Sequence, residues 1–111
     1  MRIAILTHAT APRGEVAHAL SLGEALCALG HEAVVHAPDP TGRGFYRDAT
    51  CPLVSVAAKS VVGSVAALFG GRIADYLAHF ATPADCDLDV FHATCSISGK
   101  ALDTLTRGRL V

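Results

Sequence analysis

The sequence has no tryptophan, few aromatic residues of any kind and no excess of charge of either sign. Aromatic residues make up 5% of the 111 residues, and the formal net charge at pH 7 is −1. Surfaces that bind nucleic acid are basic and often stack bases on aromatic side chains, and anionic membrane surfaces attract basic proteins. The composition therefore argues against nucleic acid and membrane surfaces as partners.

Long hydrophobic runs are also missing. A membrane-spanning helix needs about 20 consecutive apolar residues, and the best candidate, VVGSVAALFG at 61–70, is far shorter and contains glycines and a serine. The start, MRIAILTH, has one basic residue and an apolar stretch too short for a secretory signal peptide. We therefore expect a cytoplasmic protein with no membrane span.

The cysteines lack the spacing of a metal or redox site. Cys27, Cys51, Cys86 and Cys95 include no Cys-x-x-Cys pair, which is the spacing typical of zinc sites and dithiol redox sites. Free thiols are expected in a reducing cytoplasm. The predicted site accordingly contains no metal ligand, and no cofactor is expected.

What the sequence does have is apolar residues, 51% of the chain, and an alternation of strand and helix patterns. This apolar content is enough for one core, so a single domain over residues 1–111 is expected. Apolar runs and helical spacing predict strands at 2–7, 32–38, 53–57 and 88–94, helices at 15–29 and 60–80, and a last helix starting near Ser96 or Ser98.

The order of these elements defines the fold class. RIAILT, at 2–7, is a continuous apolar run led by one charge, which is typical of a strand buried on both faces of a parallel sheet. Gly30 is expected to end the first helix, and Gly70-Gly71 is a candidate break in the second. Residues 38–52, with three prolines and two glycines, are expected to form an ordered loop in place of a crossover helix. The sequence therefore predicts an α/β fold, a Rossmann-like open parallel sheet with flanking helices.

Open α/β sheets bind ligands at the carboxyl ends of their strands. This rule indicates residues 8–15, 38–39 and 92–96, of which His8, Arg13 and His92 carry the chemistry of most interest. His8 is either a binding residue or a solvated turn residue, and Arg13 either contacts an anion or is a surface charge. His92 is the stronger candidate, because Thr94, Cys95 and Ser96 add small polar side chains beside it. His18, on the expected apolar stripe, is predicted to be a hydrogen-bonded core residue.

Two phosphate-binding motifs and one catalytic constellation are absent or incomplete. A dinucleotide fingerprint needs G-x-G-x-x-G, but the first turn offers only Gly14, so Asp39 at the expected ribose position is weak support. SGK at 98–100 would need glycine and serine or threonine where Thr94 and Ala101 stand. No serine or cysteine can be paired with a histidine and an orienting group from sequence spacing, which disfavours a self-sufficient hydrolase.

Several segments, over nearly the whole chain, carry a resemblance to a known family. The chain resembles the N-terminal domain of family 4 glycosyltransferases of the GT-B fold in four segments: MRIAILTH, PRGEVAHALSLGEALCALGHEAVVHAPDPTGRGFYR, RIADYLAHF and DVFHATCSISGKAL. A more specific resemblance, to one bacterial subfamily of uncharacterised members, is carried by GRGFYR, RIADYLAHF and FHA…ISGKAL. The resemblance implies a retaining transferase that moves a sugar from a nucleotide-sugar donor to an acceptor, in the cleft between two Rossmann-like domains.

The resemblance also implies site residues. Gly14 and Glu15 match a Gly-Gly pair near the donor phosphates and the acceptor, and a carboxylate at Glu15 would repel a diphosphate. His92 matches the histidine that faces the donor sugar and is the implied catalytic residue. Thr94 and Cys95 stand where the subfamily commonly has glutamine and a small or acidic residue. The implied substrate-binding residues are His8, Arg13, Gly14, Glu15 and Thr94.

The sequence ends at Val111, before the family's C-terminal donor-binding domain. The resemblance therefore implies that the chain alone does not catalyse transfer, since that domain would stabilise the leaving diphosphate. A nucleotide-sugar donor and an unknown acceptor are the expected partners of a full enzyme. The alternative is a non-catalytic Rossmann-like binding or assembly module that covers its open sheet edge by forming a homodimer.

Overall fold

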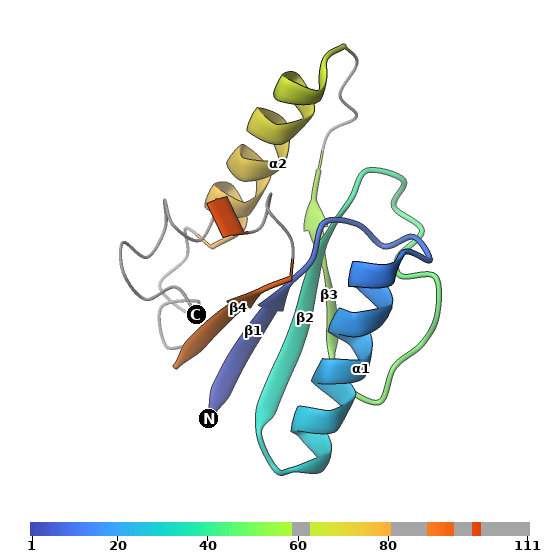
Figure 1. Ribbon diagram of the computed structural model, residues 1–111, viewed down its shortest axis with the longest axis vertical. Helices are drawn as coiled ribbons and strands as arrows, with labels where there is room; N and C mark the ends of the chain where they lie inside the picture. Colours follow the sequence, from blue (N-terminus) through green and yellow to red (C-terminus); the bar gives the residue numbers. More distant parts are fainter. Residues whose placement is uncertain (59–62, 81–88, 95–98, 101–111) are drawn as a thin grey trace.

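A parallel sheet with a helix on each face is the framework of the protein (Figure 1). The computed structural model describes residues 1–58, 63–80, 89–94 and 99–100. Along the chain the elements are β1 (Arg2–Leu6), α1 (Gly14–Ala28), β2 (Glu32–Asp39), β3 (Leu53–Ala57), α2 (Val65–His79) and β4 (Val90–Ala93). The strands are all parallel and lie in the order β3-β2-β1-β4. The predicted α/β fold with a Rossmann-like open parallel sheet is confirmed.

The inner strand β1 is buried on both faces, as its continuous apolar sequence predicts. Ile3 and Ile5 pack with α1, while Ala4 and Leu6 face the cluster that contains Tyr76 of α2. This division follows from the strand geometry, because successive side chains point to opposite faces of a sheet. The two helices therefore cover opposite faces, and β1 contributes to both halves of the core.

Helix α1 lies close to the sheet because glycine stands at its contact point. A Cβ atom added at Gly23 would lie 2.8 Å from Sγ of Cys51 and 2.9 Å from Cγ2 of Val35. The helix ends as predicted, with Gly30 at a φ of 92°, a left-handed conformation that glycine adopts without steric cost. The sequence of the first βαβ unit therefore determines both the packing and the end of α1.

The apolar stripe expected on α1, Leu22, Leu26 and Leu29 widened by Val16 and Leu20, faces the core except at Leu29, which is exposed. The residues buried on this helix are Val16, Ala19, Leu20 and Gly23. His18 is two residues past Val16, a rotation of about 200° around the helix axis, and it is exposed. The prediction of a core histidine at position 18 is therefore wrong, because the true stripe is centred on the smaller residues.

Strand β2 continues one residue beyond Pro38, although proline was expected to end it. β1 pairs with β2 only as far as Leu6 and His36, whereas β3 pairs with β2 as far as Asp39. A proline lacks the backbone N–H with which a residue of a strand donates to the neighbouring strand on one side. At Pro38 the ladder with β1 has already ended, so the strand tolerates the missing donor.

Helix α2 runs without interruption through Gly70-Gly71, so the candidate break does not occur. Its first turn is capped by Ser64, whose Oγ accepts a hydrogen bond from the Ala67 amide at 3.2 Å. Such a cap offsets part of the helix-weakening effect of glycine. Several predicted features lie outside the described residues: residues 60–62 of the predicted helix, Cys86, Cys95, and the last predicted helix with its candidate caps Ser96 and Ser98, apart from Gly99 and Lys100, which are helical.

The segment between β2 and β3 is an ordered loop, as predicted, and it packs beside α1. Arg47 forms an ion pair with Glu24 of α1 at 3.0 Å, and the Thr50 amide donates to the same carboxylate. Cys51 is buried in the core on this side, and burial raises the pKa of its thiol. Cys27 and Cys51 are free thiols. In the described part of the chain no helix is long and apolar enough to cross a membrane.

Candidate functional site

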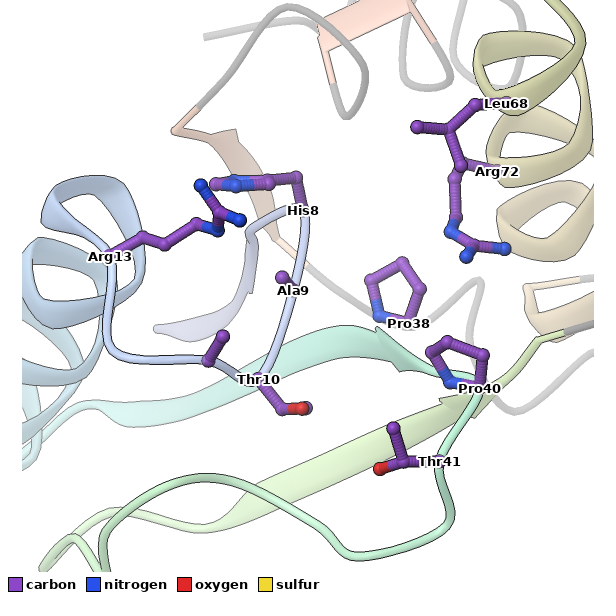
Figure 2. A pocket seen from close by; sticks show the side chains of 10 residues that line it. His8, Ala9, Thr10, Arg13, Pro38, Pro40, Thr41, Leu68 and Arg72 are labelled. Carbon is purple, nitrogen blue, oxygen red and sulfur yellow. The ribbon is translucent and has the colours of Figure 1, made fainter. Parts of the chain in front are cut away.

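A cavity of about 460 Å³ opens where β1 and β2 end, the edge of the sheet at which this fold class binds ligands. In Figure 1, α2 extends past the carboxyl ends of these strands, and its middle turns form one wall of the cavity. The turn after β1 and the turn after β2 form the remainder. The lining residues are His8, Ala9, Thr10, Ala11, Arg13, Pro38, Pro40, Thr41, Leu68 and Arg72 (Figure 2).

Among the described residues of this lining, Arg13 and Arg72 are the only arginine, lysine, aspartate or glutamate side chains. Arg13 stands immediately before α1 and is exposed, whereas Arg72 of α2 is only 8% exposed. Figure 2 shows the two side chains on opposite sides of the cavity, with Arg13 extending toward His8. The guanidinium of Arg72 is held by Asp75, with Nη1 3.2 Å from Oδ2. The cavity therefore presents positive charge from two separate elements.

Arg72 reaches the cavity because Tyr76, one turn further along α2, is fixed in the core. The Tyr76 hydroxyl donates to the carbonyl oxygen of Thr7, just after β1, and lies 3.5 Å from the carbonyl oxygen of His36 in β2. Tyr76 is fully buried. Residues four apart lie on the same face of a helix, so anchoring Tyr76 at the end of β1 places Arg72 above it.

Asp39 shapes the rim of the cavity instead of facing a ligand. Its Oδ1 accepts hydrogen bonds from the Thr41 amide and hydroxyl, and its Oδ2 accepts one from the Gly44 amide at 2.7 Å. These bonds, above all the one from the Thr41 hydroxyl, hold the pKa of the Asp39 carboxyl below its ordinary value. Because both oxygens are engaged within the loop, Asp39 is a poor candidate for the ribose contact of a dinucleotide site.

The end of β1 contains two buried polar atoms whose hydrogen bonds are not made within the described residues. They are Oγ1 of Thr7 and Nδ1 of His8. Buried polar groups are normally hydrogen-bonded, and leaving one unpaired costs about 1–3 kcal/mol. Since His8 lines the cavity, this unmet hydrogen-bonding capacity lies directly beside it.

The other predicted site residues are not among the residues that line the cavity. His92 is half-buried in β4 opposite Ile5 and, by strand alternation, shares the α1 face with Val90. The Thr94 hydroxyl donates to the carbonyl oxygen of Leu6 at 3.1 Å, which extends the pairing of β4 with β1.

The two residues predicted to lie near the donor phosphates begin helix α1. Gly14 and Glu15 are exposed there, directly after Arg13. A Cβ atom added at Gly14 would meet no atom within 4 Å. The structure therefore brings His8 and Arg13 together in the lining of one cavity, and this lining does not include Gly14, Glu15, His92 or Thr94.

Arg72 is the functional candidate that the sequence reasoning missed. A signal was present, because Arg72, Tyr76 and Phe80 are spaced four residues apart and the two aromatic residues are buried. A charged residue in phase with a buried aromatic pair indicates a polar site at the end of the apolar stripe. Among the described residues no cluster of three or more histidine, cysteine, aspartate or glutamate side chains could hold a metal ion.

The strand order, the two helical layers and the cavity at the carboxyl edge define a Rossmann-like α/β domain. Among solved structures, the chain is similar to MurG from Acinetobacter baumannii, with a TM-score of 0.60 and 16% sequence identity. The match covers 96% of this chain and 33% of the MurG chain, so the chain spans about a third of that protein's length. MurG is a GT-B glycosyltransferase, and the fold described here is GT-B-like. No family model and no curated protein matches the sequence.

Proposed function

We propose that this chain is the acceptor-side, N-terminal part of a retaining glycosyltransferase of the GT-B fold, related to family 4. The observation that carries the proposal is the cavity at the carboxyl edge of a GT-B-like sheet, with Arg13 and Arg72 facing into it. The family 4 motifs at both ends of the chain support the finer assignment. In this proposal the cavity holds the acceptor, and the sugar comes from a nucleotide-sugar donor.

In the proposed enzyme this chain binds the acceptor, and a second domain binds the nucleotide-sugar donor. His92 is proposed to face the donor sugar from β4, and Arg13, Gly14 and Glu15 to border the same cleft from the start of α1. Stabilising a leaving diphosphate requires several preorganised cationic or hydrogen-bonding groups. We therefore expect the 111-residue chain by itself to bind acceptor-like sugars and to transfer none.

The proposal can be tested by titrating the isotopically labelled chain with small carbohydrates and following its amide signals by NMR. Glucose, myo-inositol and glucose 6-phosphate are the acceptor-like probes, and UDP-glucose and GDP-mannose are the donor probes. We expect at least one acceptor-like probe to shift the signals of Thr10, Arg13 and Thr41, and the nucleotide sugars to bind more weakly than about 1 mM. Micromolar binding of a nucleotide sugar, or no carbohydrate binding at all, would contradict the proposal.

The mass of the native protein in its source cells is a complementary measurement. The chain itself weighs 11.5 kDa. Two Rossmann-like domains of about 150–200 residues each would weigh roughly 40 kDa. A native mass near the larger value supports the proposed enzyme, whereas a native mass of 11.5 kDa favours the alternative described next.

The alternative is a non-catalytic binding or assembly module, and Glu15 is the observation that favours it. Glu15 is exposed in the first turn of α1, where a carboxylate opposes the approach of a donor diphosphate. If the chain is a module, light scattering should show a homodimer, and Glu15→Gly should leave nucleotide-sugar binding unchanged. A strict monomer in which Glu15→Gly strengthens donor binding would rule the module out.

A further inference from the structure

We propose that the cavity between Arg13 and Arg72 is a phosphate site, so that the acceptor of the proposed reaction is a phosphorylated sugar or polyol. The term acceptor rests on the proposed function, whereas phosphate binding by the cavity can be tested without it. The inference is built from the charge of the lining, the rigidity of its donors and the unmet hydrogen bonds beside it.

The charge of the lining selects for anions. Arg13 and Arg72 bring two guanidinium groups to the cavity, and no carboxylate is found among the described residues that line it. The carboxylates nearest in the sequence stand outside this lining. Asp39 accepts bonds from its own loop, and Asp75 pairs with Arg72. Glu15 is exposed in the first turn of α1. A cation in the cavity would therefore meet two guanidinium groups and no carboxylate of the described lining.

The donors of the site are held in place before a ligand arrives. Arg72 is buried and oriented by Asp75, and Tyr76 fixes the helix turn below it. A guanidinium has five N–H donors in a planar fork, so an ion pair with one carboxylate is compatible with a second contact to phosphate. On the opposite side Arg13 precedes α1, whose amino-terminal end adds a partial positive charge.

The groups between the two arginines favour phosphate over a carboxylate. Thr10 brings a hydroxyl to the lining, whereas the Thr41 hydroxyl already donates its proton to Oδ1 of Asp39. His8 brings a ring whose buried Nδ1 has no hydrogen-bond partner within the described residues. A phosphate has four oxygens and up to two negative charges, and it can accept from both walls at once. A carboxylate has two oxygens on one side of a single carbon and spans such a site less well.

The rest of the lining is suited to a carbon ring. Ala9, Ala11, Pro38, Pro40 and Leu68 form an apolar part of the wall. The volume of about 460 Å³ falls within the range of about 300–1,000 Å³ that is typical of small-molecule sites. It therefore leaves room beside a phosphate for a ring that packs its C–H face on the prolines.

The test is an NMR titration of the 111-residue chain with sodium phosphate, sodium acetate and glucose 6-phosphate at constant ionic strength. We expect phosphate to shift the amide signals of Thr10, Arg13 and Thr41 to saturation, and acetate to bind at least about fivefold more weakly. Glucose 6-phosphate should bind more tightly than either phosphate or glucose. Acetate binding as tight as phosphate would overturn the phosphate assignment.

Substitutions of single arginines distinguish phosphate binding in the cavity from non-specific attraction of phosphate to the charged surface. Arg13→Gln and Arg72→Gln should each weaken phosphate binding by about fivefold or more, whereas Arg43→Gln, at an exposed arginine outside the cavity, should change it less than twofold. If Arg72→Gln unfolds the chain, the exposed Arg13→Gln still decides the question. Equal losses for Arg13→Gln and Arg43→Gln, or shifts that do not saturate, would overturn the inference.

The outcomes also distinguish this inference from the proposed function. Saturable phosphate binding in a chain that binds no carbohydrate would retain the phosphate site and reject the acceptor role. Binding of glucose or myo-inositol without any preference for glucose 6-phosphate would retain the acceptor role and reject the phosphate site.

Discussion

At the scale of single residues, the cavity rim is shaped by a carboxylate that never faces the cavity. Asp39 ends β2 with its side chain turned into the following loop, where Thr41 and Gly44 donate to it. The same hydrogen bonds lower the pKa of the Asp39 carboxyl. Because the charged form is the one that the folded loop stabilises, Asp39 links the shape of the rim to pH.

Asp39→Asn is expected to destabilise the protein at neutral pH by about 1–2 kcal/mol, since an amide cannot accept hydrogen bonds at both ends. The pKa of Asp39 is lowered in the folded state, so its contribution is complete above the ordinary aspartate value of about 4. The contribution is lost as pH falls below that value, through the lowered folded pKa.

Urea unfolding of the wild type and of Asp39→Asn at pH 7, 5 and 3 measures this effect. The difference in unfolding free energy should be similar at pH 7 and 5 and smaller at pH 3. The exposed Asp48→Asn in the same loop is the matched control and should change stability little. A difference that stays constant down to pH 3 would contradict the role given to Asp39.

A second prediction at the residue scale concerns Gly23. Gly23→Ala is expected to destabilise the protein by about 1–3 kcal/mol through overpacking, because the new methyl group would lie within 3 Å of Cys51 and Val35. Gly70→Ala in α2 is the matched control, since a Cβ atom there meets nothing within 4 Å. Gly70→Ala should stabilise by up to about 1 kcal/mol. If both alanine variants are stabilised, the close approach of α1 to the sheet is not as described.

At the scale of secondary-structure elements, the described contacts that attach α2 to the sheet come from its second half. Tyr76 donates to the Thr7 carbonyl, and Nε2 of His79 lies 3.0 Å from Nδ1 of His36 in β2. Phe80 packs against both histidine rings and against Phe91. The part of α2 that carries Arg72 therefore depends on contacts made further along the helix.

Tyr76→Phe is expected to destabilise the chain by about 1–2 kcal/mol, because it leaves the buried Thr7 carbonyl without its phenol donor. The loss should appear as faster hydrogen exchange in α2 than in α1, measured amide by amide. Tyr46→Phe, at a tyrosine that is 40% exposed, is the control and should change stability by less than about 0.5 kcal/mol. Equal acceleration in both helices would mean that Tyr76 supports the whole fold and has no special role in α2.

The elements also show how far the sequence reasoning could reach. Local chemistry predicted three features: the burial of β1 on both faces, the end of α1 at a glycine in the left-handed conformation, and the loop in place of a crossover helix. The exposure of His18 was not predicted, because the burial of the small residues Ala19 and Gly23 sets the centre of the buried face of α1. Arg72 was missed for a related reason, since its role depends on where Tyr76 docks and not on any local motif.

At the scale of the whole molecule, a ligand in the cavity would join three elements, because the lining comes from the turn after β1, the turn after β2 and helix α2. The positions of His8 and Arg13 at the edge of the sheet where the cavity opens could be predicted, because the fold class determines which edge of a sheet binds ligands. The wall formed by helix α2 could not be predicted, because its position depends on how the helix packs in the folded molecule. Ligand binding should therefore stabilise the chain as a unit.

Phosphate at ten times its dissociation constant is expected to stabilise the folded chain by about 1.4 kcal/mol. For a domain of this size that corresponds to a rise in Tm of several degrees, because 1 kcal/mol shifts Tm by about 4–8 °C. Thermal unfolding with phosphate or with chloride at equal ionic strength measures the rise. Arg13→Gln should abolish most of it while leaving the Tm in chloride almost unchanged, and an equal rise in both proteins would count against the site.

The loop between β2 and β3 has a consequence for the entropy of binding. Its Tyr46 amide donates to the carbonyl oxygen of Thr10 at 2.9 Å, and Arg47 pairs with Glu24, so two of the cavity walls are already tied together. Ordering a free loop on binding consumes part of the interaction energy, and a preorganised wall avoids that cost. Little of the interaction energy of a ligand in this cavity would therefore be lost to ordering the loop, so a small molecule with few polar groups could still bind tightly.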